Sequence, residues 1–386
     1  MKKRIAILIA ASIYNQKGLF NAAHERVKHL VDICNYSIDL YLISTYKAGI
    51  VRWLLRNPLH ERPRVYIKDD LTYNIIWIKN TVRDYFLVHK FRRQRIDALV
   101  EFKQSLHLFK DYDLVIGHSS GAYVWKIHDA FNIPFTIIWH GTDIHTTPFL
   151  SSEYMKEAKL LMENASHNFF VSKALLEKSN EITTNGKKSV SYNGRDSSFV
   201  CYSIDKKRNL KDSYSLQGKK VVAFVGNLIQ IKNVESLPNI FANIYSKEKN
   251  IVFWIFGNGP LLNSLKNDMK ELPIRFWGNV QHTQMVDFMN MMDVLVLPSL
   301  NEGLPLVTVE ALSCGCHVVG SRVGGIPESI GIENTVCLDD VNFERKMAER
   351  VLELIDSKPI IQLDDCFDWR KTAFQENTII HEILSE

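Results

Sequence analysis

The sequence predicts an α/β protein made of two Rossmann-like, doubly wound domains, and two observations support this fold class. Short apolar runs alternate with amphipathic stretches along the first half of the chain, a rhythm typical of parallel strands joined by helices. The same rhythm restarts beyond the polar pair Ser197-Ser198 and the charged run at 205–208. A length of 386 residues is enough for two domains with separate cores. We therefore expect domains at 1–198 and 199–366, followed by a last segment at 367–386.

In the first half, strands and helices are expected to alternate in order. The expected strands are 5–10, 38–43, 73–78, 114–116, 135–139 and 168–171, and the expected helices are 22–33 and 85–109. The first apolar run follows Lys2-Lys3-Arg4 and therefore also resembles a signal peptide. We interpret it as a buried strand, because it is short and leads directly into a phosphate-loop-like turn at 15–18.

In the second half, the expected strands are 219–225, 251–256, 274–277, 294–297, 317–320 and 335–338, and the expected helices are 234–246, 261–269 and 284–291. Gly257-x-Gly259 follows a strand as in a dinucleotide-binding fingerprint, but Leu262 replaces the third glycine. We interpret this segment as a tight strand-to-helix turn where a ligand can approach the backbone.

The composition is that of an ordinary soluble globular protein, with 46% hydrophobic and 23% charged residues. The first 110 residues hold 20 Lys and Arg against 9 Asp and Glu, which indicates an anionic partner or surface. Cations interleave with aromatic and apolar residues at 51–56 and 90–95, which suits either an anionic membrane surface or a solvated helix face. No nucleic-acid motif accompanies the charge, and no apolar run is long enough to span a membrane. The six cysteines are not spaced in pairs, so we expect neither a disulfide framework nor a zinc site. This cysteine usage indicates a reducing compartment.

The stretch 298–315 holds the strongest candidate site. An apolar strand runs into a loop with Glu302, and a short helix follows from Pro305 to Gly315 with Glu310 inside it. The helix N-terminus is suited to a phosphate, with a carboxylate on either side about 6–12 Å apart. That spacing also fits the carboxylate pair of a glycosidase, but two nucleotide-type domains make that function a weaker interpretation.

Two further loops contain residues that could bear chemistry. His140-Gly141-Thr142-Asp143 directly follows an apolar strand, where ligands of parallel sheets bind. From the pattern alone, a helix cap by Thr142 or Asp143 explains it equally well. Asp111-Tyr112-Asp113 resembles a metal-binding pair but precedes a strand, so we interpret it as a solvated strand start.

Several motifs together resemble retaining glycosyltransferases of the GT-B fold, family 4 (glycosyl transferases group 1). They are 224–228 with Lys232-Asn233, 256–260, 276–280, 298–311, 324–328, His140 to Asp143, 192–196 and 367–370. The resemblance implies two Rossmann-like domains facing each other across a cleft, with a last helix returning to the first domain. Asn227 stands where the family often has arginine, so we expect Arg322 or a lysine of the first domain to supply that charge.

The resemblance also implies a role for each candidate residue. Glu302 would contact the hydroxyls of the donor sugar, Lys232 the diphosphate, and His140 the sugar from the first domain. Glu310 would hold the ribose hydroxyls. The other implied donor contacts are Gly226, Asn227, Gly257, Asn279, Val280, Gly303, Leu304, Pro305 and Leu306, and the implied first-domain loop residues are Gly18 and Asp143.

The implied reaction moves a hexose-type sugar from a nucleotide-diphosphate-sugar to a glycan or lipid-linked acceptor, with retention and without a metal or other cofactor. We expect a cytoplasmic protein, peripheral at the inner face of the membrane, that serves cell-surface polysaccharide or glycolipid synthesis. Two alternatives stay open at this point: a sugar-nucleotide epimerase of the same fold, and a non-catalytic partner subunit.

Overall fold

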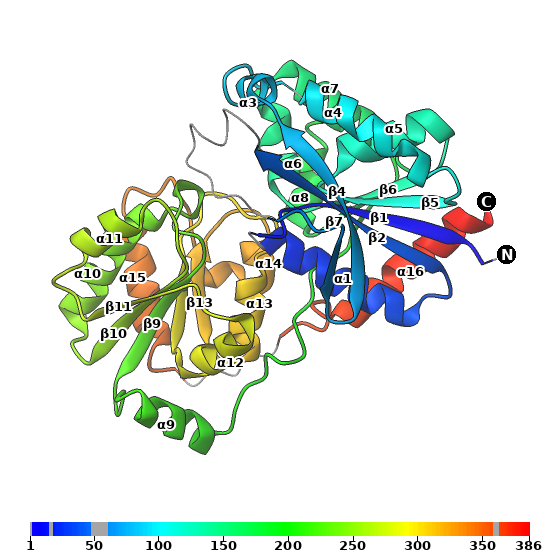
Figure 1. Cartoon of the computed structure of the whole chain (residues 1–386). Helices are drawn as coiled ribbons and strands as arrows, with labels where there is room; N and C mark the ends of the chain where they lie inside the picture. The colour runs from blue at the N-terminus through cyan, green and yellow to red at the C-terminus, as the bar shows by residue number, and fades with distance from the viewer. Residues whose placement is uncertain (1, 15–17, 48–60, 94, 358–362) are drawn as a thin grey trace. The chain divides into compact units, whose positions relative to one another are not determined.

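The computed structural model describes residues 2–14, 18–47, 61–93, 95–357 and 363–386. The chain divides into two compact units (Figure 1). Unit 1 comprises Met1–Asn193 and Trp369–Glu386, and unit 2 comprises Gly194–Asp368. The first boundary therefore lies at 193/194 where the sequence suggested 198/199, and the return lies at 368/369 where it suggested 366/367.

Unit 1 contains a sheet in the order β3-β4-β2-β1-β5-β6-β7-β8. Its strands are β1 (Arg4–Ala10), β2 (Ser37–Lys47), β3 (Val65–Lys68), β4 (Leu71–Asn80), β5 (Leu114–His118), β6 (Phe135–Trp139), β7 (His167–Phe170) and β8 (Lys188–Val190). All of these pairings are parallel except that of β3 with β4. The central strands β5 and β6 are buried along their whole length, as apolar runs covered by helices on both faces should be.

The described helices of unit 1 lie between these strands in the sequence, apart from the last one. They are α1 (Gly18–Ile33), α3 (Val82–His89), α4 (Ile96–Phe102), α5 (Gly121–Phe131), α6 (Thr142–His145), α7 (Ser152–Asn164), α8 (Lys173–Ser179) and α16 (Trp369–Ser385), with 3₁₀ turns at Lys103–Leu108 and Thr147–Leu150.

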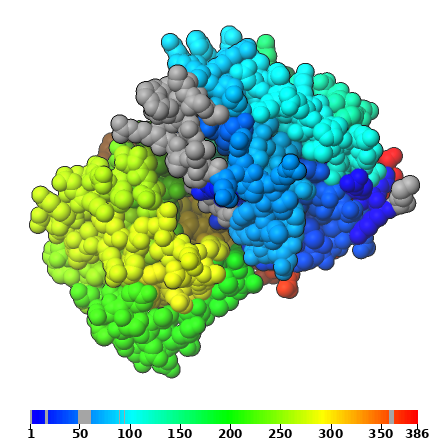
Figure 2. Space-filling model, in the orientation of Figure 1, coloured from blue at the N-terminus to red at the C-terminus, as the bar shows by residue number. Residues whose placement is uncertain are grey.

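The antiparallel β3–β4 hairpin was not expected from the sequence. Asp69 and Asp70 form its turn with φ of 46° and 63°, so both residues have the left-handed backbone that a two-residue hairpin turn of type I′ requires. An Asp-Asp pair is a weaker signal for this turn than Asn-Gly. The hairpin lies at the surface (Figure 2), where the side chain of Ile67 is exposed.

The prediction of one long helix at 85–109 is wrong, because the segment forms α3, α4 and a 3₁₀ turn. Asp84, near the start of α3, accepts hydrogen bonds from the N–H groups of Asp97 and Ala98 at 3.0 and 2.8 Å. Its carboxylate thereby satisfies free N–H groups at the start of α4, which a continuous helix would not have. Between the two helices Arg92 has a φ of 53°, a conformation that ends a helix.

Unit 2 contains a parallel sheet in the order β11-β10-β9-β12-β13-β14. The strands are β9 (Lys220–Val225), β10 (Ile251–Phe256), β11 (Ile274–Gly278), β12 (Val294–Leu297), β13 (His317–Ser321) and β14 (Thr335–Val336). The helices are α9 (Ile204–Ser213), α10 (Leu237–Lys247), α11 (Leu262–Asp268), α12 (His282–Met291), α13 (Leu306–Ser313), α14 (Ile326–Ile330) and α15 (Phe343–Leu354), with 3₁₀ turns at Gln230–Lys232, Val234–Ser236 and Ile332–Asn334. Figure 1 shows α10 and α15 on one face of the sheet and α12 and α13 on the other.

The last helix, α16, belongs to unit 1 and lies beside α1 (Figure 1). A buried ion pair joins Arg26 of α1 to Glu376 of α16. The guanidinium of Arg26 also donates to Ser191 and Asn193 at the end of the sheet. Because the charges are satisfied by several partners at once, this pair can tie three distant segments together without leaving a buried charge unpaired. The structure thus places the last helix in the first unit, as the resemblance implied.

Candidate active site

In unit 2 the site lies where the order of the strands reverses. The sheet runs from β9 to β10 and β11 in one direction and from β12 to β13 and β14 in the other. Loops that follow the two strands at such a switch point flank the usual ligand crevice of a doubly wound sheet. Lys232 is in the loop after β9 and Glu302 is in the loop after β12. Their side chains meet, with Nζ 2.5 Å from Oε1, and are only 22% and 10% exposed.

The carboxylate of Glu302 is held by its own loop as well. Ser299 Oγ donates to Glu302 Oε1 at 2.7 Å, and Leu300 N–H donates to Ile231 O at 2.9 Å. Gly324 has a φ of 48°, and a Cβ there would lie 1.8 Å from the carbonyl oxygen of Glu302. The loop after β12 is therefore fixed against both neighbouring loops, and Glu302 is positioned before any ligand binds.

Glu310 is buried in α13 and has a partner that the sequence did not reveal. His282, at the start of α12, donates from Nε2 to Glu310 Oε1 at 3.1 Å. The other ring nitrogen, Nδ1, lies 3.9 Å from Asp196 Oδ2, and the ring of Phe199 lies 5.0 Å away between centroids. His282 comes two residues after Val280, which the resemblance implied as a donor contact, and this proximity was the signal that could have identified it.

The remaining predicted donor residues lie in the loops beside these acids. Gly226 and Asn227 follow β9, and Gly257 follows β10. Gly257 has a φ of 112°, and a Cβ there would lie 1.9 Å from Gly226 O, so this glycine allows two loop backbones to pack together. Asn279 and Val280 follow β11, and Gly303, Leu304, Pro305 and Leu306 lead into α13. The helix begins and ends where the sequence indicated.

Arg322, one expected substitute for the missing arginine at 227, is engaged elsewhere. Its Nε donates to Thr335 Oγ1 at 3.1 Å, and a terminal nitrogen donates to Thr335 O at 3.3 Å. These bonds hold the guanidinium at the start of β14. Lys232 is thus the cation that the structure places against Glu302 in unit 2.

In unit 1 His140 follows β6 and pairs with a second histidine that the sequence did not single out. His118 Nδ1 and His140 Nε2 lie 3.1 Å apart, so one imidazole donates to the other. Burial lowers the pKa of His140 to about 3, with a smaller contribution from the positive charge of Arg26. Burial lowers the pKa of His118 well below its ordinary value too. Both rings are therefore neutral at pH 7.

Asp143 organises the loop that carries His140. Its carboxylate accepts from the N–H of Gly141 at 2.8 Å, from the N–H of His140 at 3.1 Å and from Ser119 Oγ at 3.2 Å. Burial raises the pKa of this carboxyl, and the hydrogen bonds oppose that shift. The two interpretations of this loop are compatible, since Asp143 fixes the backbone while the imidazole of His140 is positioned beside His118.

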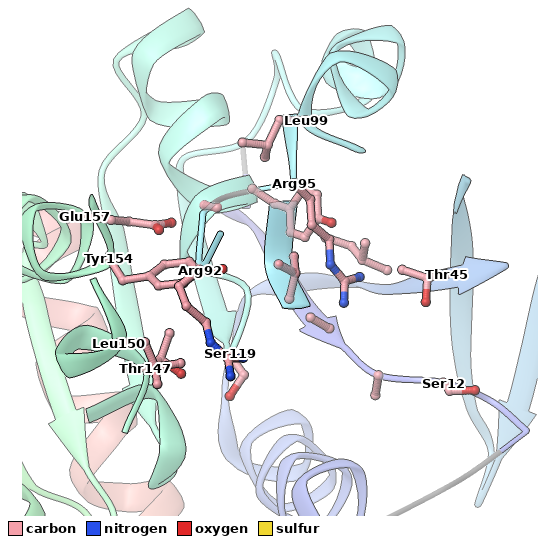
Figure 3. A pocket seen from close by; sticks show the side chains of 16 residues that line it. Ser12, Thr45, Arg92, Arg95, Leu99, Ser119, Thr147, Leu150, Tyr154 and Glu157 are labelled. Carbon is pink, nitrogen blue, oxygen red and sulfur yellow. The ribbon is translucent and has the colours of Figure 1, made fainter. Parts of the chain in front are cut away.

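A cavity of about 490 Å³ in unit 1 lies at the carboxyl ends of β1, β2 and β5 (Figure 3). Its lining includes Arg92 and Arg95, which the sequence suggested for a membrane-facing or solvated helix face. Asp143 lines an adjoining cavity of about 340 Å³. Gly18 was predicted together with Asp143 as a first-domain loop residue. It begins α1 and lines neither cavity.

Comparison with known proteins agrees with this architecture. The family model described as "Glycosyl transferases group 1" matches residues 219–357. The chain is 26% identical to the N-acetyl-alpha-D-glucosaminyl L-malate synthase of Bacillus anthracis over 70% of the chain and 74% of that protein. It is 26% identical to the putative teichuronic acid biosynthesis glycosyltransferase TuaC of Bacillus subtilis over 57% of the chain and 55% of that protein.

Solved structures extend the similarity to both units. HepE of Anabaena, solved with UDP and glucose, matches with a TM-score of 0.69 at 16% identity and 99% coverage of each chain. Sucrose-phosphate synthase of Thermosynechococcus elongatus matches with a TM-score of 0.76 at 16% identity and full coverage of both chains. The two units have the GT-B fold, and over residues 219–357 the chain is similar to the glycosyl transferases of group 1.

Proposed function

We propose that this glycosyltransferase is a retaining hexosyltransferase of family 4 that uses a nucleotide-diphosphate-sugar donor. The observation that supports the proposal most strongly is the Lys232–Glu302 pair at the switch point of unit 2, with Glu310 one helix turn beyond the loop. A cation, two carboxylates and a helix N-terminus converge there. These are the groups that a diphosphate and two sets of sugar hydroxyls need.

The proposed roles follow from charge. Carboxylates repel a diphosphate but accept strong hydrogen bonds from hydroxyls, so Glu302 suits the donor sugar and Glu310 suits the ribose. The diphosphate gains negative charge as the glycosidic bond breaks, and Lys232 and the N-terminus of α13 would stabilise it. An ammonium group has three donors, so Lys232 can bind a phosphate oxygen and Glu302 together. The neutral imidazole of His140 can bind a sugar hydroxyl without adding charge.

Metal independence is part of the proposal, because Lys232 and the helix N-terminus offer the positive charge that a metal would otherwise supply. Within the described residues, the cluster that could hold a metal is His24, Glu25 and Asp69, which belongs to unit 1 and not to the donor loops. Both ring nitrogens of His24 are already engaged, by Tyr73 Oη at 2.7 Å and Asp69 Oδ2 at 2.9 Å. A chelator should therefore leave turnover unchanged.

The proposed acceptor is a glycan or lipid-linked molecule, in cell-surface polysaccharide or glycolipid synthesis. The name of TuaC refers to teichuronic acid biosynthesis, and other relatives are subunits of phosphatidylinositol N-acetylglucosaminyltransferases, which supports this class. In the part of the chain that the structure covers, every helix is too short or too polar to cross a membrane. We propose a cytoplasmic protein bound peripherally to the inner membrane face. Of the two basic segments behind this proposal, 51–56 lies outside the described residues.

The decisive experiment is an assay of nucleoside diphosphate release with a panel of nucleotide-sugars and candidate acceptors. Acceptor-dependent release, a product with the donor's anomeric configuration by NMR, and insensitivity to chelator are the expected results. A changed sugar without any acceptor would identify an epimerase instead. No release and no donor binding with any nucleotide-sugar would leave a non-catalytic subunit. Sedimentation with anionic vesicles at low salt tests the membrane proposal separately, and no binding would remove it.

A further inference from the structure

We propose that the 490 Å³ cavity of unit 1 binds a phosphate or carboxylate group of the acceptor, with Arg92 and Arg95 as its anion ligands. This inference rests on the proposed function in naming the ligand as the acceptor. The presence of an anion site does not depend on that function.

The position of the cavity is the first argument. The unit 1 sheet reverses its strand order between β1 and β5, and ligands of such sheets bind beyond the strand ends at this point. Ser12 follows β1, Thr45 is near the end of β2, and Ser119 follows β5, and all three line the cavity. A volume of about 490 Å³ is in the range of small-molecule sites.

The second argument is the charge of the lining. Arg92 points toward Ser119, and Arg95 points into the space between Ser119 and Thr45 (Figure 3). Neither guanidinium forms an ion pair with a described carboxylate, whereas the neighbouring Arg93 pairs with Glu153 at 3.8 Å. Glu157 is the acidic residue of the lining, so two cations face one carboxylate. Guanidinium groups bind phosphates and carboxylates through paired hydrogen bonds.

The third argument is that the arginine loop is held in an unfavourable conformation. Arg92 has a φ of 53°, which a residue with a long side chain rarely adopts. Ser151 Oγ donates to Arg92 O at 2.7 Å, and Tyr154 Oη donates to Arg93 O at 2.7 Å. The start of α7 therefore fixes the loop so that Arg92 faces the cavity and Arg93 does not line it.

The start of α5 adds to the positive electrostatic potential in the cavity. This helix of 11 residues begins at Gly121, and Ser119, Ala122 and Tyr123 around its N-terminus line the cavity. The positive end of a helix favours an anion. Two arginines and a helix N-terminus thus converge from separate elements on one space.

The rest of the cavity fits the uncharged part of an acceptor. Thr147 and Tyr154 offer hydroxyls, while Ala10, Ile43, Val88, Leu99 and Leu150 form apolar walls. The adjoining cavity shares Ser119, Tyr123 and Thr147 with it and reaches Trp139 and Asp143. An acceptor anchored by its anion at the arginines would have room to extend toward the loop of His140.

Site-resolved arginine modification tests the proposal. We would treat the full chain with phenylglyoxal and measure modification of each arginine by mass spectrometry, with and without inorganic phosphate. Phosphate should slow modification of Arg92 and Arg95 and leave Arg93 unaffected. Arg92→Gln and Arg95→Gln should each raise the phosphate dissociation constant about tenfold, as loss of a charge-assisted hydrogen bond predicts, and Arg93→Gln should not. The binding should be measured in a Lys232→Gln background, so that the donor loops do not contribute. Unchanged rates of modification of Arg92 and Arg95 on addition of phosphate would overturn the proposal.

A second part of the experiment distinguishes two sources of the anion, a lipid headgroup and a soluble acceptor. Vesicles of phosphatidylcholine with phosphatidate test a lipid headgroup, and a soluble sugar phosphate tests a free acceptor. Vesicle binding that Arg92→Gln abolishes and Arg93→Gln retains assigns a lipid, whereas protection by the soluble compound alone assigns a free acceptor. Acceptor-dependent release of nucleoside diphosphate, measured on the unmodified chain with the panel of donors and acceptors described above, keeps the two proposals apart. Its absence would count against the proposed function, while phosphate protection of Arg92 would still establish the anion site.

Discussion

The two units treat their charged residues in opposite ways. In unit 2, the acids of the proposed donor loops already have cationic or imidazole partners, Lys232 for Glu302 and His282 for Glu310. In unit 1, Arg92 and Arg95 line a cavity without a described carboxylate partner, and His140 is neutral. The fully buried ion pair of unit 1, Arg26 with Glu376, lies between two helices and not in a cavity.

This difference separates a pre-organised site from one that requires a ligand. Paired acids hold their geometry without a ligand, so a donor must share Lys232 with Glu302. Unpaired arginines repel one another and hold their geometry only through the backbone, so an anion there adds the missing partner. We therefore expect changes in unit 2 pairs to affect turnover and donor binding, and changes in the Arg26 pair to affect folding.

The largest expected effect is on stability, from Arg26→Met. Removing one partner of a buried pair leaves the other charge unpaired, so Arg26→Met should lower the free energy of unfolding by about 3–5 kcal/mol. Lys28→Met on the same helix removes a partly exposed pair with Glu25 at 3.8 Å and should cost at most about 1 kcal/mol. Urea unfolding measures both. If the double change Arg26→Met with Glu376→Leu is no more stable than Arg26→Met alone, the unpaired charge is not the cause.

The next effect is on turnover, from Glu302→Gln. The variant keeps the shape of the side chain but loses the charge that binds Lys232 and the donor sugar, so kcat should fall by about 10²–10³. Stability should fall less than in Arg26→Met, because the ammonium of Lys232 is 22% exposed and can bind water in place of the carboxylate. Glu271→Gln, at an exposed position of the same unit, serves as the control. Turnover of Glu302→Gln within about twofold of the wild type would refute its proposed role.

The structure around the proposed donor site was predictable because it depends on residues that are close together in the sequence. Strand, loop and helix follow one another within 294–313, and Ser299, the loop partner of Glu302, is three residues away. Lys232 is 70 positions from Glu302, but parallel strands at a switch point bring their loops together regardless of separation. Where the geometry depends only on strand order and helix ends, the sequence predicts it.

The first half was less predictable because its geometry depends on contacts between distant residues. The break between α3 and α4 depends on Asp84, which caps a helix 13 residues later. Arg92 adopts a left-handed conformation for which glycine or asparagine would be the usual signal. The sequence therefore suggested that the cations at 90–95 lie on one helix face. In the structure, Arg92 and Arg95 line a cavity, and Arg93 forms an ion pair with Glu153.

A smaller effect is expected on donor affinity from Glu310→Gln. Loss of a charge-assisted hydrogen bond to the ribose should weaken nucleoside diphosphate binding by about 1.5–3 kcal/mol, measured by calorimetry. His282→Gln should weaken it less, by about 0.5–1.5 kcal/mol, because the imidazole acts only by orienting Glu310 through a single hydrogen bond. A larger loss for His282→Gln than for Glu310→Gln would show that the histidine contacts the nucleotide itself.

The effect that is smallest near pH 7 is a pH dependence of the stability, which belongs to unit 1. His140 has a pKa of about 3 in the folded protein and 6.5 when exposed, so between these values the unfolded state binds more protons. Its contribution to stability is therefore complete above pH 6.5 and is lost as the pH falls toward 3, with a slope of up to about 1.4 kcal/mol per pH unit. His140→Asn should reduce the slope of the unfolding free energy against pH between pH 3 and 6.5. The reduction should correspond to about one bound proton. The exposed His381→Asn is the control, and an equal flattening by both variants would show that burial of His140 is not the cause.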